Sequence, residues 1–185
     1  FLASGTGTLN TTATFTLNTK RGIKLTYNGI INTATSTTLT YGGVIAGPGS
    51  FSSGGWGKFT KAGAGNLTLS GANTYIGGTF ITAGSVILGA TGVLADTGGV
   101  VLSNIDGAIL NLNGNDETIG GLDGGGTTGG NVVLGSGTLS VNANWRPNGS
   151  NLGYHGVISG SGGISSIGTH ALVLTNASNS YSGAT

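Results

Sequence analysis

The chain has 185 residues, of which 40 are glycine and only 6% are charged, and its net charge is +1. It contains no cysteine, which excludes disulfide bonds, thiol chemistry and cysteine-based metal sites. An apolar fraction of 37% argues against disorder, and the shortage of Glu, Lys, Gln and Met argues against helices. We expect no nucleic-acid partner, because the few basic residues are scattered, and no membrane span, because no apolar run approaches about 20 residues.

The N-terminal part reads as a series of short strands. Residues Thr8–Asn18 alternate between apolar and polar side chains, which predicts a strand with one buried face. A charged corner at Lys20–Gly22 follows, then further alternating runs at Ile23–Tyr27 and Thr37–Tyr41. The pair Asn28-Gly29 between these runs is a strong turn signal.

The central stretch repeats this pattern more tightly. Alternating runs at Leu67–Leu69, Phe80–Ala83 and Val86–Leu88 are separated by glycine-rich corners such as Lys61–Asn66 and Gly71–Asn73. Corners of so few residues leave no room for helices between strands. Short strands joined by tight corners, again and again, are typical of a wound β-solenoid.

The same rhythm continues to the C-terminal end. Further runs are predicted at Val93–Leu94, Val100–Leu102, Ala108–Leu112, Ile119–Leu122, Val132–Leu134 and Leu139–Val141. The segment Trp145–Gly149 breaks the alternation and contains Pro147, which cannot donate a hydrogen bond to a β-ladder. We therefore predict that it leaves the coil as a loop.

The alternation also predicts one continuous apolar interior. At roughly 20–25 residues per coil, the chain makes about eight coils, and we expect residues 1–185 to form a single continuous solenoid. The predicted core residues are Leu9, Phe15, Leu17, Leu67, Leu69, Ile81, Val86, Leu110, Leu112, Leu139, Val141, Leu172 and Leu174.

Two stretches resemble a known family. The sequence K-A-G-A-G-N-L-T-L-S-G-A-N-T-Y-I-G-G-T at Lys61–Thr79, and the Thr-Ile-Gly-Gly-Leu corner at Thr118–Leu122, resemble the autotransporter passenger-associated β-strand repeat of large bacterial surface proteins. The resemblance implies an all-β, right-handed parallel β-helix that is exported to the bacterial cell surface. It implies a structural or adhesive role and carries over no catalytic residues.

The chain also repeats itself internally. Residues His155–Ser166 echo Gly42–Ser53, and Leu172–Thr185 echo Leu67–Thr79 with one extra residue. Because a repeat of this length exceeds one coil, each copy should span several turns.

The two ends of the sequence fit together. If Phe1 and Leu2 are written directly after Thr185, the text from Tyr181 onward continues in register with Tyr75–Leu88. We therefore expect the chain to be one unit of a longer head-to-tail array of copies, either joined by peptide bonds or stacked as subunits. Unpaired strand edges at the end coils would template such an addition, so the inter-unit junction is predicted at Phe1, Leu2, Tyr181 and Thr185.

An enzymatic role is disfavoured. Polysaccharide lyases and hydrolases with this fold need clustered carboxylates, whereas the adjacent Asp116 and Glu117 should point to opposite faces of a strand. The calcium-like sequence Gly120–Gly126 occurs only once, and His155 and His170 lack the spacing of a zinc site. We expect no catalytic residues, metal site or cofactor.

Two tryptophans are candidate contact residues. Trp56 and Trp145 both lie beside predicted loops, where an indole ring can stack on a sugar. Each is equally well explained as a lid over the apolar end of a corner. The favoured function is a non-enzymatic, structural, extracellular rod or filament segment. The alternative is an adhesive passenger that binds surface glycans or host ligands, with a polysaccharide lyase or hydrolase as the less favoured third.

Overall fold

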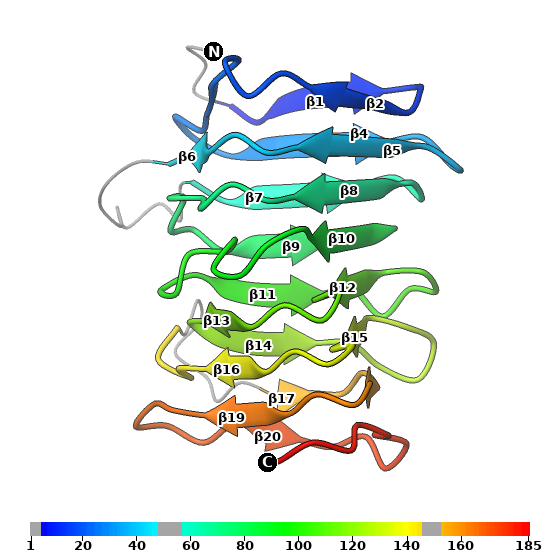
Figure 1. The fold of residues 1–185 in the computed structure, drawn as a ribbon, viewed down its shortest axis with the longest axis vertical. Coiled ribbons are helices and arrows are strands. Elements are labelled where there is room, and N and C mark those ends of the chain that lie inside the picture. The colour runs from blue at the N-terminus through cyan, green and yellow to red at the C-terminus, as the bar shows by residue number, and fades with distance from the viewer. Residues whose placement is uncertain (1–4, 48–56, 146–152) are drawn as a thin grey trace.

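The computed structural model describes residues 5–47, 57–145 and 153–185, and every regular element in these ranges is a β-strand. All the strand pairings are parallel. The strands stack as successive layers along one axis (Figure 1), so the chain is a β-solenoid. The predicted fold class is confirmed.

Three faces surround the solenoid. The first face is one eight-stranded sheet. Its strands, in spatial order, are β1 (Gly7–Thr11), β4 (Gly29–Thr33), β7 (Phe59–Ala62), β9 (Thr79–Ile81), β11 (Gly99–Leu102), β14 (Gly121–Gly124), β17 (Gly153–Tyr154) and β20 (Val173–Leu174).

The second face is a seven-stranded sheet. It consists of β2 (Phe15–Leu17), β5 (Thr38–Tyr41), β8 (Asn66–Leu69), β10 (Ser85–Leu88), β12 (Ile109–Asn111), β15 (Asn131–Val133) and β18 (Ile158–Ser159).

The third face is less regular. It contains β3 (Ile23–Lys24) paired with β6 (Ile45–Ala46), and a separate sheet of β13 (Glu117–Ile119), β16 (Leu139–Val141) and β19 (Ile164–Ser166). Between these two sheets the backbone has no strands, but isolated hydrogen bonds still join the layers. The amide of Thr74 donates to the carbonyl of Ile45 at 3.0 Å, and the amide of Asn73 donates to the carbonyl of Val93 at 2.9 Å.

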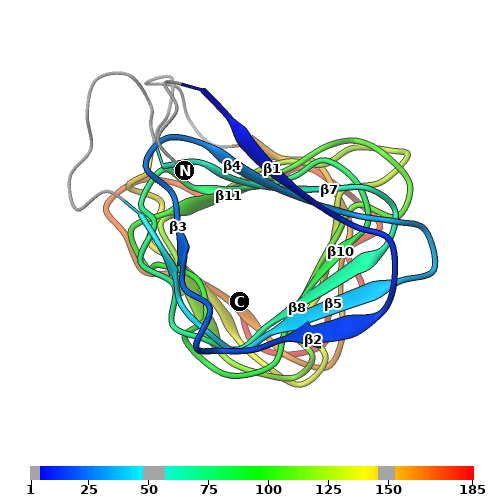
Figure 2. The same ribbon diagram turned by 90° about the horizontal axis from the view of Figure 1, so that it is seen from above.

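The eight strands of the first face are separated by seven intervals, so the described chain completes seven turns and begins an eighth. About eight coils were expected from 20–25 residues per coil. The difference arises because two coils are longer: β4 and β7 are paired 30 residues apart, as are β14 and β17. Seen from the N-terminal end in Figure 2, the chain runs clockwise from β1 to β2 to β3 as it recedes, which is the right-handed winding expected of parallel β-crossovers.

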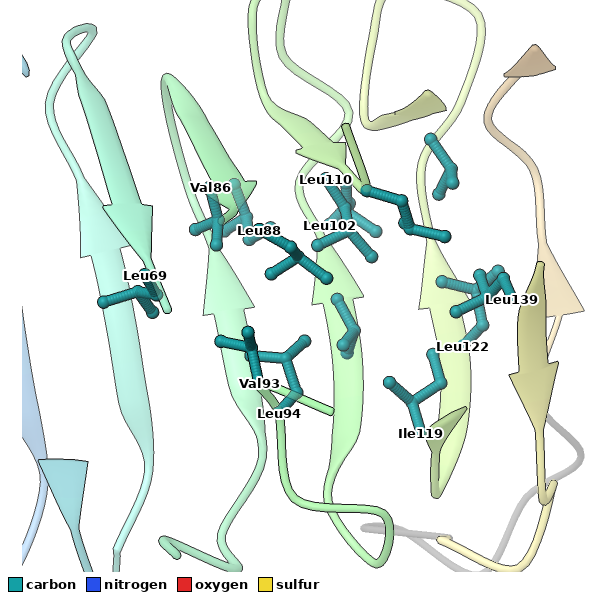
Figure 3. Packing of buried hydrophobic residues seen from close by; sticks show 14 of the residues in the cluster. Leu69, Val86, Leu88, Val93, Leu94, Leu102, Leu110, Ile119, Leu122 and Leu139 are labelled. Carbon is teal, nitrogen blue, oxygen red and sulfur yellow. The ribbon is translucent and has the colours of Figure 1, made fainter. Parts of the chain in front are cut away.

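Alternation along each strand places every second side chain inside, where the coils align them in columns. On the second face Leu39, Leu67, Val86, Leu110 and Val132 are partners in consecutive strands. All five are fully buried, and Figure 3 shows Val86 and Leu110 pointing into the interior with Leu102 and Leu122 of the first face. Such a column buries apolar surface in every coil, which is the main term that stabilises the winding.

Most of the predicted core is confirmed: Leu67, Leu69, Ile81, Val86, Leu110, Leu112, Leu139 and Val141 are buried. The prediction is wrong for Leu9 and Phe15, each 41% exposed, and only partly met for Leu17, Leu172 and Leu174, which are half-buried. The reason is position. All five belong to the first or last coil, where no further layer covers the interior. The run Thr8–Asn18 is also two strands, β1 and β2, with a corner between them.

Candidate functional site

The N-terminal end of the solenoid is open and apolar. The first-face column begins at Leu9 and the second-face column at Phe15, in register with buried Ile31 and Leu39 of the next coil. A cavity of about 310 Å³ opens at this end, and its lining includes Leu9, Leu25 and Ile31. Since β1 pairs only with β4, its other edge carries backbone groups without strand partners in the described chain. This is a surface prepared to receive another strand layer.

The C-terminal end mirrors it. Strand β20 pairs only with β17, Leu174 and Tyr181 are half-buried against the core, and Val173 is 40% exposed. The hydroxyl groups of Tyr181 and Thr185 lie 2.8 Å apart, within hydrogen-bonding distance. Both predicted C-terminal junction residues therefore lie on the last layer. The predicted N-terminal junction residues, Phe1 and Leu2, lie outside the described residues.

A lysine occupies the interior of the first face. Lys61 is fully buried and stands in the apolar column between Ile31 and Ile81. Its ammonium donates hydrogen bonds to the carbonyls of Ala62 at 2.8 Å, Gly63 at 2.7 Å and Ala83 at 3.1 Å. Burial lowers the pKa of Lys61 to about 8. The three carbonyls stabilise the charged form and limit this effect.

The sequence analysis assigned Lys61 to a corner, which is wrong: it belongs to β7. The signal was present, because Lys61 has the same parity as Phe59 in an alternating run and must share its inward face. The corner begins two residues later at Gly63, whose φ of +72° is one that glycine adopts without strain.

A glutamate occupies the interior of the third face. Glu117 is 2% exposed and is in register with buried Leu139. Its carboxylate accepts hydrogen bonds from the amides of Val93 at 2.8 Å, Leu94 at 3.3 Å and Thr118 at 3.2 Å. Burial raises the pKa of Glu117 to about 7, because desolvation outweighs these three hydrogen bonds. The carboxylate thus replaces a missing piece of β-ladder between two coils.

Acidic side chains meet on the outside of the third face. Asp96, Asp116, Glu117 and Thr118 line a cavity of about 430 Å³, and the negative charge of Asp96 adds to the raised pKa of Glu117. As predicted, Asp116 points outward and Glu117 inward. The arrival of Asp96 was not foreseen, because it is 20 residues away and reaches this place only through the winding.

This acidic cavity does not have the form of a catalytic site. Both carboxylate oxygens of Glu117 are held by backbone amides, and Asp116 accepts a 2.7 Å hydrogen bond from the amide of Thr138. A general acid needs a proton-carrying oxygen within reach of substrate, whereas Glu117 faces the interior. Within the ranges that the structure describes, no group of three or more His, Asp or Glu side chains is arranged to hold a metal ion.

The two tryptophans differ in what can be said of them. Trp56 lies outside the described residues. Trp145 is 6% exposed and covers the backbone at Gly78, Gly99 and Gly120, with its ring edge 6.3 Å from that of Phe80. This geometry corresponds to the lid and leaves no open ring face for a sugar. The more accessible aromatic at this corner is half-buried Phe80, with the Lys58 ammonium 5.1 Å from its ring centre.

The two histidines also stay apart from any site. The His155 ring contacts the hydroxyl of Thr175, and the His170 ring lies 3.1 Å from the side-chain oxygen of Asn144. No segment that the structure describes forms an apolar helix of membrane-spanning length.

Comparison with known proteins gives two similarities. The family model described as "Passenger-associated-transport-repeat" matches residues 59–88 and 167–185. The chain is 40% identical over 117 residues, 63% of its length, to a protein of Brucella suis biovar 1 (strain 1330) named "Adhesin BmaC autotransporter". The match covers 3% of that relative's length. No solved structure matches the chain.

Proposed function

We propose that this chain, which carries two passenger-associated-transport repeats of the autotransporter passenger family, is a non-enzymatic structural segment of a bacterial surface protein. In this role it is an extracellular β-solenoid rod whose two ends are covered by further coils, supplied by copies of the same sequence. The observation that carries the proposal is the pair of apolar ends: the same column begins at exposed Leu9 and finishes at half-buried Leu174.

The interior supports a load-resisting rather than a catalytic role. Each coil contacts only its neighbours, so the solenoid lengthens by adding identical layers without altering those already present. The buried charged groups are committed to backbone hydrogen bonds between coils: Lys61 bonds to Ala83, and Glu117 bonds to Val93. In the described ranges, no ionic side chain of the acidic cavity is both exposed and free of a neighbouring coil in the way that substrate cleavage requires, apart from Asp96 at its rim.

The location can be tested with an epitope tag inserted at Gly92, an exposed corner with open space around it. In the bacterium that produces the chain, antibody should label the tag on intact cells. A signal that appears only after lysis would contradict an extracellular role. Purified chain should also release no sugar from acidic or neutral polysaccharides, and turnover that Asp96→Asn abolishes would overturn the non-enzymatic assignment.

An adhesive passenger is the second candidate, favoured by the printed name of the similar protein. The test is binding of the purified chain to a glycan array and to host cells. A rod gives no saturable binding. An adhesin that uses the aromatic corner gives binding that Phe80→Ala and Trp56→Ala weaken, while the control Phe15→Ala, a change on the N-terminal end of the solenoid, leaves it unchanged.

A further inference from the structure

The internal repeat forms the same contacts twice. In the first copy the amide of Ile45 donates to the side chain of Asn73 at 2.7 Å, and the hydroxyls of Tyr75 and Thr79 lie 2.8 Å apart. In the second copy the amide of Ile158 donates to Asn179 at 2.8 Å, and Tyr181 and Thr185 lie 2.8 Å apart. The difference is burial. Tyr75 is 1% exposed beneath the next coil, whereas Tyr181 is half-exposed on the last one.

The second copy is turned back by one face. Ile45 belongs to β6 on the third face, whereas its counterpart Ile158 belongs to β18 on the second. Likewise Leu69 belongs to β8 on the second face, and its counterpart Leu174 belongs to β20 on the first. The two copies are therefore offset by a whole number of coils minus one face.

This offset fixes what must follow Thr185. In the first copy, Thr79 begins a first-face strand, and the next strand, β10, lies on the second face with Leu88 paired to Leu69. Turned back by one face, Thr185 lies on the third face, and the next strand must lie on the first face with its leucine against Leu174. The hydrogen bond from the amide of Ile164, in third-face strand β19, to the carbonyl of Ala184 at 3.0 Å puts the end of the chain where this reasoning requires.

The N-terminal strand meets both requirements. In the register that joins Phe1 to Thr185, Leu9 is the counterpart of Leu88. Strand β1, which contains Leu9, lies on the first face, and Leu9 stands in the same inward column that ends at Leu174. Face, parity and column therefore agree without adjustment.

We propose that a second copy of this chain, joined after Thr185, continues the solenoid in phase, with Leu9 of the following copy seated on Leu174. Each copy then contributes eight coils to the array, because β1 of the next copy follows β20 as the ninth first-face strand. At about 4.8 Å per layer the repeat is about 38 Å. Every copy presents its three faces on the same sides, so the corner at Phe80 and the acidic cavity recur along one side of the rod.

This inference rests on the proposed function, since it takes the covering coil to be a copy of the same sequence. It is tested with two tandem fusions of the chain. The first joins Thr185 directly to Phe1, and the second inserts eight Gly/Ser residues there, which is about one face of a coil. Amide hydrogen exchange is measured at Val173 and Leu174, and at Leu9 and Asn10 of the second copy, with Leu69 and Leu88 as internal references.

In the direct fusion, the junction amides should exchange at least about 100-fold more slowly than in the single chain and approach the reference rates. In the inserted fusion they should keep the single-chain rates. Equal rates in both fusions, whether protected or not, would overturn the in-phase join. Protection specific to the direct fusion, found together with glycan binding by the single chain, would retain the join and overturn the rod function.

Discussion

The Lys61 ammonium donates a 3.1 Å hydrogen bond to the carbonyl of Ala83, a residue in the next coil. With its bonds to Ala62 and Gly63, this makes a buried cation the link between two stacked corners. An apolar residue at this place would fill the column but leave three carbonyls without this donor. Lys61→Ala should therefore lower the free energy of unfolding by about 2–5 kcal/mol, from the lost packing and the unpaired carbonyls together.

Urea unfolding followed by circular dichroism measures this change. The matched control is Lys58→Ala in the same coil, where the ammonium is near the surface over Phe80 and the cost should stay below about 1 kcal/mol. Equal effects of the two substitutions would contradict the internal role of Lys61.

The two buried charges predict an unusual dependence of stability on pH. Glu117 has a pKa raised from 4.5 to about 7, so its contribution to stability is greatest below pH 4.5 and is lost as the pH rises through 7. Lys61 has a pKa lowered from 10.5 to about 8, so its contribution is greatest above pH 10.5 and is lost as the pH falls through 8. Their joint contribution should be smallest between pH 7 and 8, with each limb rising by up to about 3 kcal/mol.

Unfolding midpoints measured from pH 4 to 10.5 test this shape. Glu117→Gln should flatten the acidic limb alone, and Lys61→Met the alkaline limb alone. A native chain that is most stable at neutral pH, or variants that leave both limbs in place, would show that these groups do not titrate as described.

Position along a column should decide the cost of removing a leucine. Leu102 and Leu174 belong to the same first-face column, but Leu102 is 1% exposed in the middle and Leu174 is half-buried at the end. Leu102→Ala should cost about 2–5 kcal/mol, whereas Leu174→Ala in the single chain should cost about 1 kcal/mol or less. Calorimetric melting of both variants decides this, and similar losses would mean that the end coil is already covered.

The lid formed by Trp145 requires glycine beneath it. A methyl group on Gly99 would overlap the indole ring, so Gly99→Ala should cost about 1–3 kcal/mol. The cost should shrink when Trp145 is replaced by alanine as well, which a double-mutant cycle measures. Gly22→Ala is the control, because its added methyl meets no atom within 4 Å. Additive effects of Gly99→Ala and Trp145→Ala would show that the ring does not rest there.

What the sequence determined by itself is the local geometry. Alternation at Leu67–Leu69 and Val86–Leu88 has one physical meaning, a strand with one face buried, and glycine between such runs allows only short corners. From this the all-β class, the winding and the buried central leucines could be predicted. The same parity rule could have predicted that Lys61 faces inward beside Phe59.

Only the tertiary structure decided which residues of different coils meet. Nothing local brings Asp96 to Glu117, lays Trp145 over Gly99 or exposes Leu9, because each depends on how many residues a coil consumes and on whether another layer follows. Two coils take 30 residues where their neighbours take 20 to 22, and each such excess shifts every later contact. A pattern of period two fixes the side of the strand that is buried, but the length of each coil fixes its neighbours.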